Sequence, residues 1–477
     1  MAVNGVSGVK KGLETKWLIL AAVMLGSFMA PLDGSIVNTV LPAITQYFQT
    51  DISIVQWVPT VYLLTISCFI LFYGRLGDIF GYRKIFLYGL AGFTLTSLLC
   101  GLSQSIWMLI AFRALQGLSA GMIMAVGFAI ITSAFPPTER GKAMGIYAIS
   151  IAAALGLGPT IGGAVAEYLS WHYVFIINVP IGIAALLWCY RVIPQGVTKP
   201  GQRLDWYGVL TAFVFLLSLL LFANRGQAWG WLSPASISLI IVVLISGAAF
   251  IWLERRIEQP MLNLALFKSR VFRFASLSAL LNFVAIYSII FLTPFYLAFV
   301  LHYDILKVGL VMAASPIATL FIAPLAGVLS DRIGSRGLTA FGMGTCAVGI
   351  FLMSGLDASS SSTDVIWRLV ICGIGAGMFQ SPNNSAMMGS VPVFHLGIAS
   401  GILAAMRNVG MVLGLALAGV VLYNLAPVAA SGWIGPLTGK ELEEFLNGLH
   451  WAYVTGGIVA CIAAVTSLAA VERSGET

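Results

Sequence analysis

The sequence predicts an all-α integral membrane protein with about fourteen transmembrane helices, built as two six-helix bundles in a pseudo-two-fold repeat plus two inserted helices. Composition is the first of three observations: 59% of the 477 residues are hydrophobic and only 9% are charged, whereas about a quarter of a soluble domain is charged. The second is a series of apolar runs of about twenty residues, each long enough to cross a bilayer. The third is an internal repeat.

The apolar runs follow one another along the whole chain. The first follows three lysines as a signal peptide would, but it is too long and no small-residue cleavage site follows it, so we interpret it as the first span. The predicted spans cover residues 17–38, 54–73, 86–105, 107–132, 142–165, 172–191, 206–223, 236–253, 275–300, 308–329, 338–355, 365–388, 398–424 and 450–471.

Charge orients the predicted spans. An even number of spans places both termini on one side, and Lys and Arg concentrate on the cytoplasmic side of a membrane protein. Basic residues such as Arg83, Lys84 and Arg140 fall in loops on the side of the termini, whereas few, such as Arg225 and Lys307, fall opposite. We therefore expect both termini to be cytoplasmic. The net charge of +7 then reflects topology and contact with anionic lipid, and we expect no nucleic-acid partner.

Cysteine and histidine give no sign of a bound metal. The six Cys and four His lie singly along the chain, without paired spacing. This pattern predicts neither a disulfide framework nor a metal site. We expect no cofactor.

An internal repeat relates two parts of the chain. GRLGDIFGYRK (74–84) recurs as GVLSDRIGSRG (327–337), with Gly, Asp, Gly and Arg at a constant offset. These loops follow the second and tenth predicted spans, so equivalent loops are eight spans apart, although two adjoining six-helix repeats would place them six apart. Two spans are therefore inserted, and polar linkers flank the best candidates, 206–223 and 236–253. The predicted divisions are an amino-terminal bundle (1–193), a linker with two extra helices (194–273) and a carboxy-terminal bundle (274–477).

Parallel six-helix repeats with a binding site at their interface are an architecture of alternating-access transporters. The chain resembles the major facilitator superfamily, specifically its fourteen-helix drug:proton antiporter branch, over nearly its whole length. LDGSIVNTVLP resembles the signature of that branch's first helix, and GRLGDIFGYRK the superfamily's loop signature. His172 stands where the family usually has Arg. The remaining matches are LIAFRALQGLSAG (109–121) to the fourth-helix signature, GLGPTIGG (156–163) to the antiporter signature of the fifth helix, and WHYVFIINVPIG (171–182) to the segment that follows.

The resemblance implies a proton-coupled antiporter that exports amphipathic or cationic compounds, as in multidrug efflux, from a bacterium across its cytoplasmic membrane. It also leaves open an exporter or flippase of a lipid or glycolipid, which the same family includes. The expected partners are a small amphipathic substrate, protons and membrane lipid, and we expect a monomer driven by the proton gradient. An enzyme is disfavoured, because the sequence contains no recognisable metal cluster or nucleophile and base pair.

One acidic and one basic residue inside the apolar runs are the candidates for proton coupling. Asp33 and Arg113 lie in the first and fourth spans at the same predicted level of the membrane. A charge inside a membrane usually faces protein or a water-filled cavity and has a partner. We therefore expect them to pair, either as a structural ion pair or as a switch for protons or substrate. The repeat aligns Arg113 with Leu369, so this charge belongs to one half only.

Polar and aromatic residues in other spans are candidates for lining a substrate cavity, although helix packing or interfacial anchoring would explain each one singly. They are Asn38, Gln56, Trp57, Tyr62, Gln116, Asn282, Tyr287, Gln380, Asn383, Asn384, Arg407 and Asn408.

Gating is predicted for two kinds of segment. In the repeated loop, glycines would permit a tight turn with positive φ and close helix approach, and its charges would pair with neighbouring loops or a helix end. In the fifth span, glycines would clear a helix face and a proline would bend the helix. The loop candidates are Gly74, Asp78, Gly81, Arg83, Glu139, Arg140 and Asp331, and those of the fifth span are Gly158, Pro159, Gly162 and Gly163. Plain topogenic turns and plain packing are the alternatives.

A surface helix is predicted before the last span. TGKE (438–441) fits a capping box, with Thr438 as cap and Glu441 three residues later. Apolar residues then share one helical face up to Leu449. We expect a short amphipathic helix here, separate from the last span.

Overall fold

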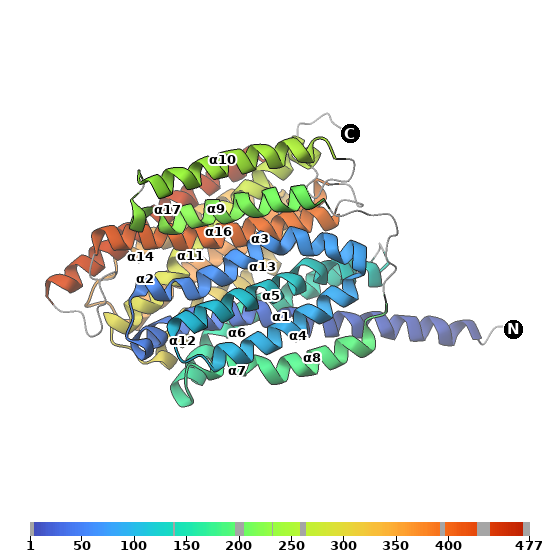
Figure 1. Ribbon diagram of the computed structural model, residues 1–477, viewed down its shortest axis with the longest axis horizontal. Helices are drawn as coiled ribbons and strands as arrows, with labels where there is room; N and C mark the ends of the chain where they lie inside the picture. Colours follow the sequence, from blue (N-terminus) through green and yellow to red (C-terminus); the bar gives the residue numbers. More distant parts are fainter. Residues whose placement is uncertain are drawn as a thin grey trace.

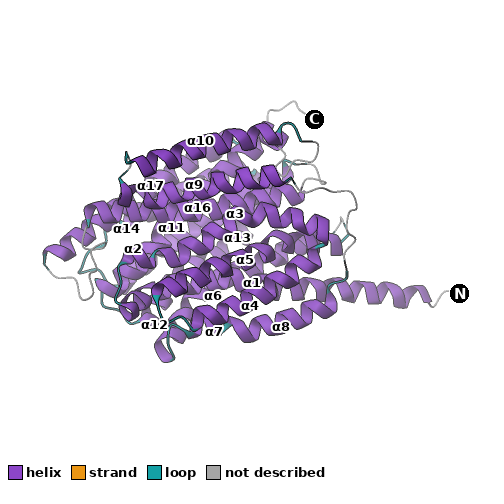
Figure 2. Cartoon of the chain, viewed as in Figure 1, coloured by secondary structure: helices purple, strands orange, loops and turns teal. Residues whose placement is uncertain are grey.

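The structure is a computed structural model, and it describes residues 4–136, 139–195, 205–230, 232–257, 264–391, 396–426 and 439–470. All regular secondary structure in these ranges is helical (Figure 2). Thirteen helical segments of the described residues are long and apolar enough to cross a membrane. Helix α6, with 29 residues, lies where a further predicted span was placed. The predicted fold class is therefore confirmed.

The helices run side by side along one direction (Figure 1). The amino-terminal half contains α1 (Asn4–Phe48), α2 (Ile52–Val55), α3 (Trp57–Phe80), α4 (Tyr82–Gly101), α5 (Ile106–Ala134), α6 (Arg140–Tyr168), α7 (Tyr173–Ile176) and α8 (Asn178–Val192). The carboxy-terminal half contains η1 (Leu264–Lys268), α11 (Arg270–Phe299), α12 (Ile305–Met312), α13 (Ala314–Ile333), α14 (Ser335–Met353), α15 (Ser362–Gly389), α16 (Leu396–Leu425) and α17 (Lys440–Ala469). We call the end at which α1 begins the proximal end and the opposite one the distal end; the charge pattern predicts that the proximal end is cytoplasmic.

Helices α9 (Trp206–Trp229) and α10 (Pro234–Glu254) join the two halves. They pack against each other at one side of the bundle, and α9 also contacts α3 and α16 (Figure 1). In the most apolar 18-residue segment of each helix, only 22% and 11% is buried inside the protein, the lowest shares among the candidate spans. Because apolar surface can face lipid at no cost, these peripheral helices need no protein cover.

Local sequence sets several helix ends. The side chains of Ser105, Ser269 and Ser361 accept hydrogen bonds from backbone N–H groups in the first turns of α5, α11 and α15, which satisfies donors that a helix start leaves free. Gly81 and Gly334 have φ of 93° and 85° and separate α3 from α4 and α13 from α14. Glycine adopts this conformation without strain, so the positive φ predicted for the repeated loop is confirmed in both halves.

Two predicted boundaries are wrong. Helix α1 continues to Phe48, ten residues beyond the predicted span 17–38, although Pro31 and Pro42 lie inside it. Helix α17 begins at Lys440 and runs without a break to Ala469, so the residues after 440 are its first turns and not a separate surface helix. Its N-cap is Gly439, which offers no side chain, and Thr438 lies outside the described residues. The apolar face itself is present, because Phe445 and Leu449 are buried.

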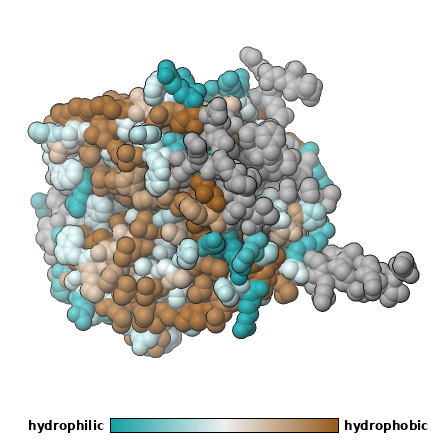
Figure 3. Space-filling view, turned by 45° about the vertical axis from the view of Figure 1, so that its right-hand side comes forward, coloured by the Kyte–Doolittle hydropathy of each residue, from teal (hydrophilic) through white to brown (hydrophobic). Residues whose placement is uncertain are grey.

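The larger of two apolar cores among the described residues runs through both halves, and the smaller one lies in the carboxy-terminal half. Between the halves, α6 packs on α12 and α13, α3 on α16, and α1 on α11. Apolar residues also cover much of the described surface in the view of Figure 3, with hydrophilic residues in smaller groups between them. An apolar interior within an apolar exterior is the pattern of a protein whose flanks face hydrocarbon.

Candidate functional site

A buried charge network occupies the centre of the amino-terminal half. Arg113 of α5 donates through Nη1 to Asp33 Oδ2 of α1, and neither side chain has exposed surface. The other carboxylate oxygen, Oδ1, accepts from Gln116 Nε2 and from Asn178 Nδ2, each at 3.1 Å. Three helices, α1, α5 and α8, thus supply one closed set of partners. The predicted pairing of Asp33 with Arg113 is present.

A second layer of contacts holds this network in place. Arg113 Nε donates to the Val58 carbonyl oxygen at 3.3 Å, and its guanidinium carbon lies 4.0 Å from the centre of the Tyr62 ring. Gln116 also donates to Ser97 Oγ at 2.7 Å. The Tyr62 hydroxyl in turn donates to the Ala30 carbonyl oxygen at 3.0 Å. Hydrogen bonds and a ring face therefore replace much of the water that the two charges lose on burial.

A further arginine inside the bundle lies in the carboxy-terminal half. Arg407 of α16 is half-buried and lies close enough to Tyr62, Tyr147 and Tyr287 to interact electrostatically with all three hydroxyl groups. These tyrosines come from α3, α6 and α11 and are at most 6% exposed. The Tyr287 hydroxyl also lies beside Asn38 of α1. Five helices from both halves thus meet around one guanidinium group.

Hydrogen bonds join the halves in the distal part of the bundle. Gln56 Nε2 donates to the Leu415 carbonyl oxygen at 2.8 Å, and the Tyr423 hydroxyl donates to Gln56 Oε1 at 2.6 Å. Gln56 was predicted to line a substrate cavity, but its amide group is instead occupied by α16 at the distal end of the interface. The reason is topological: α2 and α3 begin at the distal end, where α16 finishes.

Glycines of α6 allow close approach on two sides. A Cβ at Gly158 would lie 2.5 Å from Ser35 of α1, and one at Gly162 would lie 3.0 Å from Ile36. On the other side, a Cβ at Gly163 would lie 2.7 Å from the carbonyl oxygen of Ile305 in α12. The α6 glycines therefore do clear helix faces, as predicted, and one of those faces belongs to the boundary between the halves.

The repeated loops are fastened within each half. Arg83 Nη2 donates to the Tyr190 carbonyl oxygen at 2.5 Å, and Arg336 Nε donates to the Leu468 carbonyl oxygen at 2.8 Å. Each arginine thus holds the last turn of the sixth membrane-spanning helix of its own half, where carbonyl groups lack helical partners. The predicted pairing with a helix end is present in both repeats.

Other gating candidates divide into three groups. Glu139 pairs with Lys16 at 2.5 Å, which links the start of α6 to α1. Gly74 does not serve close approach, because a Cβ there would meet open space. The crowded glycine near this turn is Gly77 in the last turn of α3, where a Cβ would lie 2.7 Å from the Tyr82 ring. The side chains of Asp78, Arg140 and Asp331 lie outside the described part of the structure.

Several predicted cavity residues have other contacts. The Trp57 ring lies 4.7 Å from the guanidinium carbon of Arg225 in α9, at the side of the inserted helices. Asn383 donates to the Ala275 carbonyl oxygen of α11 at 3.1 Å, and Asn408 donates to Ala404 of its own helix at 2.9 Å. For these three, packing or anchoring explains the polar group.

Three further predicted cavity residues differ in exposure. Asn282 is fully buried, and neither polar atom of its side chain has a hydrogen-bond partner among the described residues. Gln380 is half-buried, and Asn384 is exposed near the proximal end of α15.

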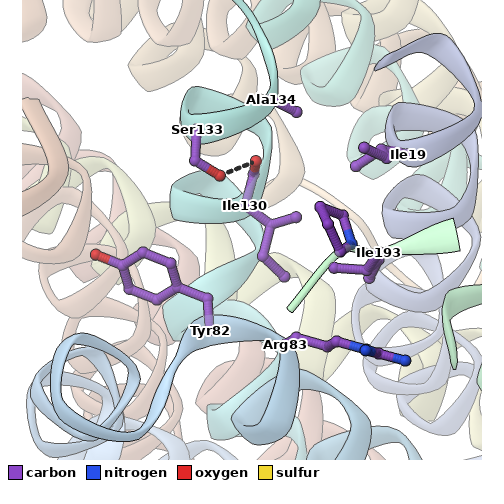
Figure 4. Close-up of a pocket in the computed structure, with 8 residues that line it drawn as sticks. Ile19, Tyr82, Arg83, Ile130, Ser133, Ala134 and Ile193 are labelled. Carbon is purple, nitrogen blue, oxygen red and sulfur yellow. Dashed lines mark hydrogen bonds between the residues drawn. The ribbon is translucent and has the colours of Figure 1, made fainter. Parts of the chain in front are cut away.

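A small pocket lies at the proximal end of the amino-terminal half (Figure 4). Its wall is mostly apolar and comes from α1, α4, α5 and the chain after α8; it includes Ile19, Tyr82, Ile130 and Ile193. The guanidinium group of Arg83, at its edge, is the one that holds Tyr190. The pocket therefore belongs to the fastened loop and lies away from the Asp33 network.

Four residues that take part in these contacts were not predicted from the sequence: Asn178, Ser97, Tyr147 and Tyr423. Asn178 carried a usable signal, because it is an amide inside an apolar run of a motif that resembles the family. Ser97 carried none, since serine hydroxyl groups in helices commonly bond to their own backbone, and nothing in the sequence distinguished Tyr147 and Tyr423 from the other tyrosines of the spans.

Comparison with known proteins decides the family. The model of the Major Facilitator Superfamily matches residues 23–415. The chain belongs to this superfamily. A crystal structure of a bacterial homologue of the human lysosomal transporter Spinster, in an inward-facing conformation, superposes with a TM-score of 0.67 at 17% identity over 95% of this chain and 96% of that one, so the two share the superfamily fold.

Curated relatives of this superfamily member carry transport names. Riboflavin transporter RibZ from Clostridioides difficile is 34% identical over 85% of this chain and 88% of the relative. Multidrug resistance protein Stp from Mycobacterium tuberculosis is 32% identical over 90% and 79% of the two chains. The Tetracenomycin C resistance and export protein of Streptomyces glaucescens is 28% identical over 95% and 91%. The protein is therefore a multi-pass membrane transporter of the superfamily.

Proposed function

We propose that the protein is a proton-coupled antiporter that exports amphipathic compounds by alternating access across the cytoplasmic membrane of a bacterium, with both termini in the cytoplasm. The observation that carries the proposal is the Asp33 carboxylate, which is enclosed in the amino-terminal half by Arg113, Gln116 and Asn178. A carboxylate that loses these partners in another conformation changes its affinity for a proton. The multidrug-resistance and export names of two relatives support the direction of transport.

Alternating access requires contacts between the halves that form and break. Those of Gln56 with α16 and of Gly163 with α12 lie in the distal part of the bundle, so the distal side is joined in this conformation. In the opposite conformation the halves separate there. Helix α6 carries Gly163 at this interface and packs on α1, which carries Asp33. A change at the interface is therefore transmitted to the Asp33 network.

Coupling then follows from linkage. If the protonated and ionised forms of Asp33 favour different conformations, the proton gradient biases those conformations, and movement of the halves in turn takes up or releases the proton. Arg113 is the counter-ion that must find compensation when Asp33 is protonated. No cofactor enters this scheme, and the energy comes from the proton gradient.

The test is transport by purified protein in liposomes with an imposed pH gradient. Asp33→Asn keeps the size of the side chain but cannot ionise, so we expect it to abolish uphill export while substrate binding partly survives. The panel includes riboflavin, because a relative bears that name, as well as dyes and a fluorescent phospholipid, whose movement would indicate lipid export instead. Glu443→Gln, at an exposed position of α17, is the matched control and should transport normally. An Asp33→Asn protein that exports at the wild-type rate and still moves protons would overturn the proposal.

A further inference from the structure

Arg407 presents a positive charge between the halves that no acidic side chain of the described residues pairs with. In the part of the chain that the structure describes, Arg407 belongs to no ion pair, and its electrostatic partners are the hydroxyl groups of Tyr62, Tyr147 and Tyr287. A lone cation inside a membrane protein is costly, so such residues face a partner or a water-filled path and mark sites of function. Arg113 differs from Arg407 in this respect, because Asp33 already compensates the charge of Arg113.

Arg407 is more accessible than the three tyrosines around it. Tyr62 and Tyr147 are each 2% exposed and Tyr287 is 6% exposed, yet Arg407 between them keeps accessible surface. Since these tyrosines come from both halves, Arg407 lies at the boundary between the halves. Asp33 has no exposed surface at all. The net charge offered to a molecule at this boundary is therefore positive.

The surroundings of Arg407 also supply aromatic faces. The Phe128 ring lies edge-on to the Tyr147 ring, with centres 4.7 Å apart. Gly127 makes room for the Tyr147 hydroxyl, because a Cβ at Gly127 would lie only 2.8 Å from that oxygen. Aromatic side chains give large contact areas to flat molecules without fixing one structure. A guanidinium group adds two parallel donors that match a carboxylate or a similar oxyanion.

We propose that Arg407 binds an acidic group of the substrate, so that the compounds this protein exports are flat amphipathic anions rather than cations. This inference rests on the proposed function and narrows its substrate class. It departs from the expectation of cationic substrates, because the one carboxylate at the centre is enclosed by its own donors whereas the accessible charge is a guanidinium group.

The experiment measures binding of two dyes to the whole protein in lipid nanodiscs by fluorescence anisotropy. Fluorescein at pH 8 and rhodamine 6G share the flat xanthene ring system but carry opposite charge. We expect wild-type protein to bind fluorescein about tenfold or more tightly than rhodamine 6G, a difference of about 1.4 kcal/mol. Arg407→Gln should lower the affinity for fluorescein to that for rhodamine 6G. Arg407→Lys, which keeps the charge and loses the paired donors, should lie between them.

The matched control is Arg270→Gln, which removes the same charge at the exposed start of α11 and should bind both dyes as the wild type does. The inference would be wrong if wild-type protein bound rhodamine 6G as well as fluorescein, bound neither dye, or kept its preference in the Arg407→Gln variant. If Arg407→Gln does not fold, Arg407→Lys still decides, because unchanged discrimination between the dyes contradicts paired recognition. Export driven by a pH gradient tests Asp33 separately, so loss of anion preference with gradient-driven export intact would overturn this inference alone.

Discussion

The Tyr423 hydroxyl of the carboxy-terminal half donates a hydrogen bond to Gln56 Oε1 of the amino-terminal half at 2.6 Å. Gln56 also donates from Nε2 to the Leu415 carbonyl oxygen at 2.8 Å, so both polar atoms of one amide are held by α16. Gly419 lies against the same amide, where a Cβ would be 2.7 Å from Gln56 Oε1. One side chain thus joins the halves at the distal end, and opening of that end breaks both hydrogen bonds and exposes the amide group of Gln56 to water.

Tyr423→Phe should favour opening of the distal end. The variant leaves the buried Gln56 Oε1 unpaired, which costs about 1–3 kcal/mol, but only in the conformation in which the halves are joined there. We expect the distance between spin labels at the exposed positions Tyr47 and Lys440 to shift to longer values in electron paramagnetic resonance. Tyr88→Phe, at an exposed position of α4, is the control. An unchanged distance in Tyr423→Phe would show that the contact between Tyr423 and Gln56 does not hold the distal end together.

Gly309→Ala should keep α6 and α12 apart. A Cβ at Gly309 would lie 2.2 Å from the Pro159 carbonyl oxygen, a distance that requires the backbones to separate. Because the variant disfavours only the joined distal end, we expect transport in liposomes to fall about tenfold or more, as for a shift of about 1.4 kcal/mol or more between the two conformations. Gly344→Ala in α14, where a Cβ meets nothing within 4 Å, should transport normally. Equal rates for both variants would show that this approach does not limit transport.

Removing Arg113 alone should destabilise the protein more than removing both charges. Arg113→Gln leaves Asp33 as an unpaired buried charge, and breaking a buried pair in this way costs about 3–5 kcal/mol. We expect a lower thermal unfolding temperature in detergent for Arg113→Gln. The double variant Asp33→Asn/Arg113→Gln should recover much of this loss. That double variant should fold without uphill export. If it unfolded as easily as Arg113→Gln, the cost would come from the packing of Arg113 on Tyr62 and not from its charge.

Asn178→Leu should weaken the network without removing a charge. Asp33 Oδ1 would lose one of its two amide donors, and we expect a loss of about 1–3 kcal/mol in the free energy of unfolding. Denaturation in detergent measures this loss. Asn424→Leu is the control, because the side chain of Asn424 is exposed and bonds only to the carbonyl oxygen of Val420 in its own helix. Similar stabilities of the two variants would show that Asn178 is not part of the support of Asp33.

The sequence alone determined the number and type of the helices, because a span must be apolar over about twenty residues and this is a local property. It also determined the pairing of Asp33 with Arg113, since few charges lie inside the spans and a buried charge requires a partner. Gly81 and Gly334 helped to reveal the repeat for a similar reason, because a turn with positive φ favours a glycine at one position and this preference is local. Helix ends were less well determined, as α1 and α17 show, because lipid and protein both tolerate a helix that continues beyond its apolar segment.

Only the tertiary structure decided which polar side chains meet. Gln56 and Arg407 looked alike in the sequence as polar residues within spans, yet Gln56 is occupied by Tyr423 and Leu415, whereas Arg407 keeps accessible surface among three tyrosines. Asn178 joined Asp33 from a helix 145 positions away in the chain. The physical reason is that the rotation of each helix about its axis is fixed by packing against several neighbours, and a sequence lists those neighbours without saying which faces they turn towards one another.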